Sequence, residues 1–518
     1  MFALLWLLVP FVMAADTTPK TDNLIVDTQT GSYYGQVNSK YSQVREFLNI
    51  PYALPPTEER RWLPPQKLSS SDKMWDATQF PPSCPQFVSK SPSVYNEIVP
   101  EFLIYHGTEN STAGQFALGS SEDCLSLAIW TPKNATKDSK LPVLMFMTGG
   151  AMVMGGIDIP YQLPPQWVNR TQEHIVVTIN YRLNIMGYPN AAGLDEQNLA
   201  ILDQRMALEW LRDNVASFGG DPTKITLWGQ SAGSESTDLH SFAFPDDPIA
   251  QGHYMESGNV FLDERSYDYG HTNFTFVAKN LGCDFPNDAK KELECMRKVP
   301  VSKIINFMGQ YQDKGSQPAI SFLPIADEKI IFSNYTERYQ QGKVAKIPAI
   351  VGNCASEGSS LIQYPASNVT EGPWKEAITN YTFENWICQA AKTLQLRASA
   401  GLTSYRYQYA GNFSNVSPLP WLGVYHDADL PMVFGTFNDF RGQASDLEVK
   451  TSEAIQDFIL SFARDPHNGP GSLGWPAWQN ADSKILRFGT NGKPYEVISD
   501  AEVDGLCLGR SGTYNIYP

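Results

Sequence analysis

The middle of the chain alternates between short apolar runs and amphipathic stretches. Strand-length runs rich in apolar or β-branched residues occupy 141–147, 174–183, 225–228 and 349–351, and residues 405–409 alternate as strands do. Residues 199–216 and 452–464 instead repeat apolar side chains at helical spacing, with Asn198 and Ser452 as candidate caps. Strands that alternate with helices predict an α/β fold, in which a mostly parallel sheet is flanked by helices.

The pentapeptide Gly229-Gln230-Ser231-Ala232-Gly233 directly follows the predicted strand 225–228. A G-x-S-x-G pattern between a strand and a helix is typical of a sharp turn that holds a serine hydroxyl above a sheet. By itself the pentapeptide also fits an ordinary glycine-rich turn. Its position after a strand favours Ser231 as a catalytic nucleophile.

A nucleophilic serine needs a histidine base and an acid behind it, and in this fold the chain order is serine, acid, histidine. His426 lies on a predicted loop well downstream of Ser231, whereas His174 begins a strand and His240 falls on the helix after the turn. Between Ser231 and His426, Glu357 follows the strand 349–351 and precedes a glycine. A surface carboxylate is the alternative for any single glutamate, and Asp427 and Asp429 are alternative acids.

A candidate oxyanion hole lies upstream, where Thr148-Gly149-Gly150-Ala151 follows the strand 141–147. A double glycine is often only a tight turn, but this fold places its glycine-rich oxyanion loop at the end of such a strand. We therefore predict that the backbone amides of Gly150, Ala151 and Ala232 stabilise the oxyanion.

Net charge narrows the range of partners. The 518 residues carry a formal charge of −16 and a sequence pI near 4.9. Nucleic acids and anionic membranes bind proteins that have an excess of lysine and arginine, and this chain has no such excess. We therefore expect neither a nucleic acid nor an anionic membrane surface as a partner.

The first fifteen residues are apolar and end in small residues, which predicts a secretory signal peptide over 1–15, although no lysine or arginine precedes the apolar run. No later apolar run reaches the length of a membrane span, so no stable membrane anchor is expected. No linker or repeat divides the remainder, and residues 16–518 are predicted to form a single domain. Secretion also agrees with the seven cysteines and with nine glycosylation sequons, at Asn110, Asn134, Asn169, Asn273, Asn334, Asn368, Asn380, Asn412 and Asn415.

Several segments together resemble the type B carboxylesterase/lipase family, which includes the cholinesterases. They are REFLNIPYALPP, SEDCLSLAIWTP, NYRLNIMGY, the long stretch from Asn198 to Ser234, the region of Glu357, and YHDADLPMVFG. The resemblance extends from about residue 24 to about residue 465 and implies an α/β-hydrolase fold and ester hydrolysis without a metal or organic cofactor. It also implies nucleophile, acid and base roles for Ser231, Glu357 and His426, and the oxyanion role for Gly150, Ala151 and Ala232.

The family's recurrent disulfides imply pairs Cys84–Cys124 and Cys283–Cys295, and a third pair, Cys388–Cys507, is similar to one in cholinesterases. Cys354 is then left unpaired, as a small buried residue.

Three departures from the family pattern limit what can be transferred. Thr148 stands where the family usually has histidine or tyrosine, and Gln230 stands where it usually has glutamate. No tryptophan lies between Cys84 and Cys124, where cholinesterases place their platform for choline. The expected partner is a small-molecule ester substrate, and we expect bulky, uncharged, hydrophobic esters rather than choline esters.

Two rival functions and one structural question stay open. The chain could be an inactive adhesion or binding protein, although such relatives typically lose the nucleophile, or an acyltransferase or lyase on the same fold. The oligomeric state is not predicted. The segment between Cys84 and Cys124 is unusually apolar for a loop, and either packs as a static core or forms a flap over Ser231; its large apolar residues are Phe87, Val94, Tyr95, Ile98, Val99, Phe102, Leu103, Ile104 and Tyr105.

Overall fold

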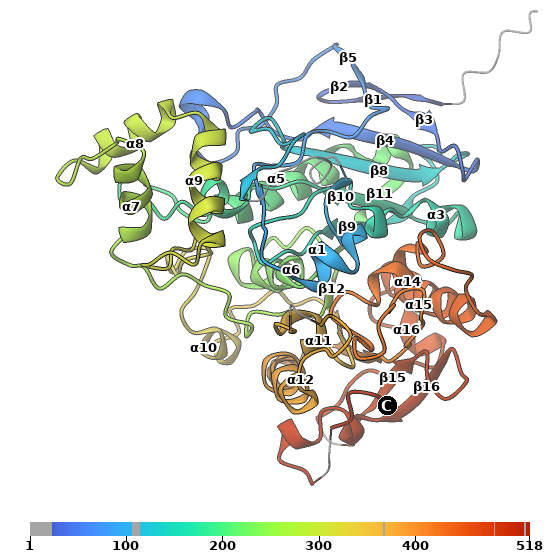
Figure 1. The fold of residues 1–518 in the computed structure, drawn as a ribbon. Coiled ribbons are helices and arrows are strands. Elements are labelled where there is room, and N and C mark those ends of the chain that lie inside the picture. Colours follow the sequence, from blue (N-terminus) through green and yellow to red (C-terminus); the bar gives the residue numbers. More distant parts are fainter. Residues whose placement is uncertain (1–22, 106–113, 366–367, 481, 512–513) are drawn as a thin grey trace, which may run out of the picture.

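A large mixed sheet forms the centre of the protein (Figure 1). The computed structural model describes residues 23–105, 114–365, 368–480, 482–511 and 514–518, so the expected signal peptide and the sequon at Asn110 lie outside the described residues. The sheet has eleven strands in the order β16-β15-β14-β13-β12-β11-β9-β10-β8-β4-β3. Their bounds are β3 (Gln36–Val37), β4 (Val44–Pro51), β8 (Ser126–Pro132), β9 (Leu141–Met147), β10 (Ile175–Ile179), β11 (Gly220–Gln230), β12 (Gly252–Glu256), β13 (Ala349–Cys354), β14 (Ser404–Tyr409), β15 (Lys484–Phe488) and β16 (Tyr495–Ser499).

The pairings from β10 through β15 are parallel, and antiparallel pairings occur only towards the two edges of this sheet, within the described chain. The predicted α/β fold with a mostly parallel sheet is therefore confirmed. The carboxyl ends of β9, β11, β12 and β13 lie along one edge, which is where an α/β sheet places its active site.

Alternation along β9 divides the core between the two faces of the sheet. Val143, Met145 and Met147 pack with one cluster of apolar residues, and Leu144 and Phe146 pack with another; all five are fully buried. Helices α5 (Leu199–Asn214) and α6 (Ala232–Ala243) contribute to the first cluster, and α3 (Pro165–Thr171), α14 (Leu430–Phe434) and α15 (Asp446–Arg464) contribute to the second. Burial of each such side chain contributes about 1.5–3 kcal/mol, so both faces anchor the sheet.

Further helices lie beside these layers. Helices α7 (Thr272–Asn280), α8 (Ala289–Lys298) and α9 (Val301–Asp313) gather at one side of the sheet around their own apolar cluster (Figure 1). The remaining α-helices in the described chain are α1 (Val94–Glu97), α4 (Asn184–Gly187), α10 (Tyr335–Gln340), α11 (Gly358–Leu361), α12 (Lys375–Thr382), α13 (Cys388–Ser399) and α16 (Gly469–Ser472). Small sheets pair β1 (Ile25–Thr28) with β2 (Gly31–Tyr34) and β5 (Met74–Asp76), and β6 (Phe87–Val88) with β7 (Gln115–Phe116).

The starts of two predicted helices need correction. Asn198 precedes α5 but does not cap it: its side chain bonds to the backbone of Ile325 and to Asp327. The C-terminal helix starts earlier than predicted, because α15 begins at Asp446 behind a capping box formed by Ser445 and Glu448. Ser452 lies inside that helix and donates a hydrogen bond to the Met432 carbonyl.

Disulfides join Cys84 to Cys124, Cys283 to Cys295 and Cys388 to Cys507, the pairs that the family resemblance implied. All seven cysteines lie within the described residues, and Cys354 alone is unpaired and buried. Between Cys84 and Cys124, Val94, Val99, Phe102 and Ile104 are buried. Much of this segment therefore packs as part of the core. Among the described residues no helix has the length and apolarity that a membrane span requires.

Candidate active site

Ser231 stands on the sharp turn that the G-x-S-x-G pattern predicts, between the end of β11 and the start of α6. Its backbone angles, φ 55° and ψ −125°, lie outside the regions that residues other than glycine prefer, a strain worth about 1–3 kcal/mol. A Cβ at Gly229 would lie 2.1 Å from the Gly233 carbonyl oxygen, and one at Gly233 would lie 2.0 Å from the Met147 carbonyl oxygen. The turn therefore requires glycine at both positions, and the surrounding structure holds the strain in place.

Glu357 and His426, far apart in the sequence, form a buried pair. His426 Nδ1 donates to Glu357 Oε2 across 2.5 Å, and both side chains are almost inaccessible to solvent. The other oxygen of Glu357 accepts from Ser257 Oγ at 2.6 Å and from the Cys354 backbone N–H at 2.7 Å. The carboxylate is thus fixed from the ends of β12 and β13, in an orientation that holds the imidazole.

The two alternative acids lie elsewhere. Asp427 Oδ1 is 3.8 Å from the opposite ring nitrogen, Nε2, and Asp429 Oδ2 accepts from Tyr407 Oη at 3.1 Å. Neither contacts Nδ1, so of the three acids considered only Glu357 is placed to orient the ring.

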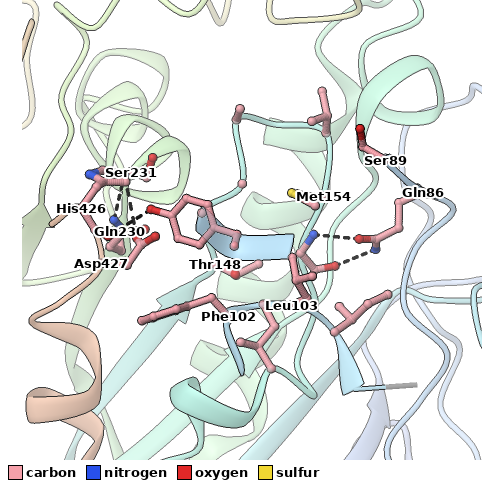
Figure 2. A pocket seen from close by; sticks show the side chains of 18 of the residues that line it. Gln86, Ser89, Phe102, Leu103, Thr148, Met154, Gln230, Ser231, His426 and Asp427 are labelled. Atoms are coloured by element: carbon pink, nitrogen blue, oxygen red, sulfur yellow. Dashed lines mark hydrogen bonds and ion pairs between the residues drawn. The ribbon is translucent and has the colours of Figure 1, made fainter. Parts of the chain in front are cut away.

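Gln230 contacts the second ring nitrogen of His426, the one that does not face Glu357. Its Nε2 donates to His426 Nε2 across 3.1 Å, a bond that requires the neutral ring (Figure 2). Among the described side chains, no hydrogen bond joins Ser231 Oγ to the imidazole. Catalytic hydrogen bonds are often long without substrate, and the two side chains line one pocket, so the arrangement agrees with a resting state.

Opposing effects set the basicity of His426. Burial lowers its pKa. The charges of Asp427 and Glu357 raise the pKa by more than burial lowers it, so the net result is a pKa of about 9. The Gln230 N–H favours the neutral ring and so opposes this rise.

The predicted oxyanion loop lies against Ser231. A Cβ on Gly149 would be 3.0 Å from Ser231 Cβ, and one on Gly150, with φ 109°, would be 2.4 Å from the Met154 carbonyl oxygen. Ala232 is the first residue of α6, where backbone N–H groups have no partner within the helix. Gly150 and Ala151 line the same pocket as Ser231, which is the placement that an oxyanion hole needs.

The pocket that holds these groups has a volume of about 380 Å³. Figure 2 shows Ser231, Gln230 and His426 at one end and Gln86 and Ser89 at the other. Side chains between Cys84 and Cys124 form a largely apolar wall, among them Phe87, Tyr95, Phe102, Leu103 and Ile104. That segment thus packs on the core and lines the pocket at once, and the proposed flap motion remains a hypothesis.

Several contacts of the site were not predicted from the sequence. Trp386 lies against the His426 ring, with centroids 4.4 Å apart, and Tyr95 Oη donates to the His426 carbonyl at 3.0 Å. Ser257 immediately follows β12, and its position at the end of a parallel strand could have marked it as a residue of the site. Tyr95, on α1, was predicted only as one of the apolar residues of its segment, and Trp386, on the helical turn Phe383–Ile387, was not singled out.

The structure also places the other histidines considered as bases and the predicted glycosylation sites. His174 and His240 are buried away from the pocket, and burial lowers the pKa of each to about 3. Asn415 is buried and its Nδ2 donates to the Phe437 carbonyl at 2.9 Å, so a glycan does not fit there and that expectation is corrected. Asn169 and Asn273 are half-buried, and the remaining described sequons are exposed, at Asn134, Asn334, Asn368, Asn380 and Asn412.

Comparisons with known proteins agree with this geometry. The Carboxylesterase family matches residues 22–403 and 373–504 of the chain. A chlorogenic acid esterase from Aspergillus niger is 40% identical over 97% of this chain and 98% of its own length. Secreted lipase 5 from Gibberella zeae is 37% identical over 98% of each chain, and an acetylcholinesterase from Bungarus fasciatus is 26% identical over 91% of this chain and 84% of its own. The chain therefore belongs to the carboxylesterase family and is a carboxylic ester hydrolase.

Proposed function

We propose that the protein is a secreted serine esterase that forms an acyl-enzyme on Ser231. The observation that carries this proposal is the buried Glu357–His426 pair at the end of a pocket that also holds Ser231 on its strained turn. A nucleophile, a base and an orienting acid in one cavity are the parts that acyl transfer through serine requires.

The proposed reaction has two halves. Ser231 Oγ attacks the ester carbonyl while His426 Nε2, released from Gln230, takes the hydroxyl proton. The amides of Gly150, Ala151 and Ala232 bind the oxyanion, and the tetrahedral intermediate collapses as His426 returns the proton to the leaving alcohol. Water then attacks the acyl-enzyme by the same steps, which frees the acid and restores Ser231. Glu357 keeps Nδ1 protonated and stabilises the imidazolium, and no step requires a metal or organic cofactor.

The walls of the pocket favour uncharged esters with an apolar part. Phe87, Phe102, Leu103 and Ile104 offer apolar surface rather than charge. The relatives named chlorogenic acid esterase and secreted lipase make aromatic and long-chain esters the first substrates to test.

Secretion is part of the same proposal. Its support is the apolar start of residues 1–15, the three disulfides, and the exposed sequons. We further infer that residues 16–518 act as one domain, because a single sheet takes strands from almost the whole described chain.

The test compares wild type with Ser231→Ala on p-nitrophenyl esters from acetate to long and aromatic acyl groups. Wild type should turn over these esters, and Ser231→Ala should lower kcat by about 10⁶, as loss of the nucleophile does in other serine hydrolases. Ser236→Ala, one turn further along α6, is the matched control and should keep near wild-type kcat. Mass spectrometry of acid-quenched wild type should find the acyl group on the Ser231 peptide. Wild-type rates in Ser231→Ala would overturn the assignment, and an inactive wild type would favour a binding protein.

A further inference from the structure

Glu264 places in the wall of the pocket a carboxyl oxygen that has no hydrogen-bond partner among the described residues. It follows β12 in the chain and lines the cavity together with Ser231 and His426. Its Oε2 is shielded from solvent and has no hydrogen-bond partner among the described residues. A shielded oxygen without a partner costs stability, so its presence beside a substrate cavity points to a group that the substrate supplies.

Other polar side chains around this cavity are already engaged within the protein. Gln86 donates to the carbonyls of Cys84 and Gly155, at 3.0 and 2.8 Å, and accepts from the Gly155 N–H at 3.0 Å. Ser89 and Thr148 donate to Asp313 and Gln162, at 2.7 and 3.0 Å. These side chains are therefore occupied with holding the wall, unlike Glu264 Oε2.

A second shielded polar atom of the pocket lies near the same place. Trp386 Nε1 is buried without a hydrogen-bond partner among the described residues, and its ring lies against His426. Glu264 also lies close enough to His426 for the histidine charge to lower its pKa, against the larger opposite effect of burial. The region around the catalytic base thus offers both a donor and a carboxyl group that the protein leaves unused.

Glu235 interacts electrostatically with Glu264 and so affects which substrate groups the Glu264 carboxyl group can bind. It is fully buried on α6, where its N–H donates to the Ser231 carbonyl at 2.8 Å. Burial first, and then the charge of Glu264, raise the pKa of Glu235 well above its usual range. A neighbouring carboxylate and burial both disfavour the charged form of Glu235, so Glu235, which does not line the pocket, is the member of the pair that favours a proton. Glu264, which lines the pocket, then offers its Oε2 as a hydrogen-bond acceptor, which matches the donor of a substrate hydroxyl group.

We propose that Glu264, backed by Glu235, is a specificity residue that hydrogen-bonds a hydroxyl group of the ester substrate. The proposal rests on the proposed function, because it uses the same pocket and the same reaction. It adds a chemical requirement to the apolar walls: the preferred ester is hydrophobic, uncharged and hydroxylated. The hydroxyl lies on either the acyl or the alcohol part, and the experiment separates the two.

The experiment measures kcat/KM of the full-length protein on matched ester pairs. One pair is methyl cinnamate and its 4-hydroxy derivative, which differ only in a hydroxyl on the acyl part. The other is propyl butyrate and 3-hydroxypropyl butyrate, which differ only in a hydroxyl on the alcohol. The variants are Glu264→Leu, which removes the polar group, and Glu264→Gln, which keeps a donor and an acceptor at similar size. Asp263→Asn is the matched control, because Asp263 is the exposed neighbouring carboxylate and does not line the pocket.

Wild type should prefer the hydroxylated member of one pair by about 10-fold or more, as sites that bind a substrate hydroxyl do. Glu264→Leu should abolish that preference, because it should lower kcat/KM for the hydroxylated ester by about 10-fold more than for the plain ester. Glu264→Gln should keep part of the preference, and Asp263→Asn all of it. Circular dichroism and titration of the active serine with an organophosphonate would establish that each variant is folded and competent.

Three results would overturn the inference. Wild type could show no hydroxyl preference in either pair, or prefer a choline ester over both, or Glu264→Leu could lower both members of a pair equally. In each of these cases wild-type hydrolysis of the plain ester would leave the proposed function standing. Absence of all ester hydrolysis in wild type would instead contradict the proposed function itself.

Discussion

At the scale of single residues, the contact between Gln230 and His426 is one place where the site departs from the family pattern. An amide donor facing Nε2 favours the neutral imidazole, and the general base must be neutral to accept the serine proton. A carboxylate in the same place would favour the imidazolium. The amide thus counteracts the two carboxylates, Asp427 and Glu357, that raise the pKa of His426 to about 9.

This contact predicts opposite pH shifts in two variants. Gln230→Glu replaces the donor with a negative charge and should raise the pKa of His426, which moves the acid limb of the kcat/KM profile to higher pH by about one unit. Asp427→Asn removes a charge that raises this pKa, so its limb should move to lower pH. The measurement is kcat/KM for an uncharged ester between about pH 5 and 10. Coincident profiles for wild type and both variants would contradict the argument.

The proposed triad could be predicted from the sequence, but its neighbours could not. Ser231 follows from a local motif, and Glu357 and His426 follow from chain order and from their places after a strand and on a loop. Glu264 is a lone glutamate in a loop, and only tertiary packing brings it to Glu235 and the pocket. The same holds for Trp386, because ring contacts across the chain have no signature in the local sequence.

At the scale of elements, apolar runs predicted the strands well because buried parallel strands are almost continuously hydrophobic. The helix starts were predicted less well. Asn198 has the right residue type for a cap, but the chain near Ile325 engages its side chain. The Ser445 capping box was visible as Ser-x-x-Glu, but the first turns of α15 are too polar to extend the apolar pattern back to it.

The segment between Cys84 and Cys124 both packs in the core and lines the pocket, and two adjacent residues contribute differently to these roles. Phe102 is buried, with its ring against Tyr95, Tyr161 and Tyr425, whereas Leu103 is half-buried and faces the cavity. Phe102 therefore serves mainly the core, although it also borders the pocket, whereas Leu103 serves the substrate wall alone.

Separate substitutions should distinguish these roles. Phe102→Ser should lower the free energy of unfolding by about 3–5 kcal/mol, the usual cost of emptying an aromatic core site. Leu103→Ser should leave stability nearly unchanged and raise KM for a long-chain or aromatic ester by about 10-fold, from lost apolar contact, with little effect on a short acetate. Denaturant titration and steady-state kinetics on the two variants measure both effects. Equal KM changes for long and short esters in Leu103→Ser would contradict its place in the substrate wall.

At the scale of the whole molecule, the C-terminal segment is fastened to β14, the third strand from one edge of the sheet, and to the helix beside the pocket wall. Arg406 of β14 and Asp504 form a fully buried ion pair, with Nη2 and Oδ1 3.0 Å apart. Cys507 is joined to Cys388 at the start of α13, two residues after the Trp386 that lies against His426. The far end of the chain thus supports the wall of the pocket as well as the edge of the sheet.

The length of chain that each disulfide closes predicts how much each one stabilises the fold. Cys388 and Cys507 are 119 residues apart, and Cys283 and Cys295 are 12 apart. Restriction of the unfolded chain grows with loop length, so Cys388→Ser with Cys507→Ser should cost about 5 kcal/mol and Cys283→Ser with Cys295→Ser about 3 kcal/mol. Guanidinium titration of the two double variants beside wild type measures the difference. The first pair should also reduce kcat for esters at low denaturant, because loosening α13 disturbs the contact of Trp386 with His426, whereas the second, in the separate cluster of α7 and α8, should not. A larger loss of stability from the short loop would contradict the loop-length argument, and full activity of the first variant up to its unfolding transition would show that the C-terminal segment does not support the site.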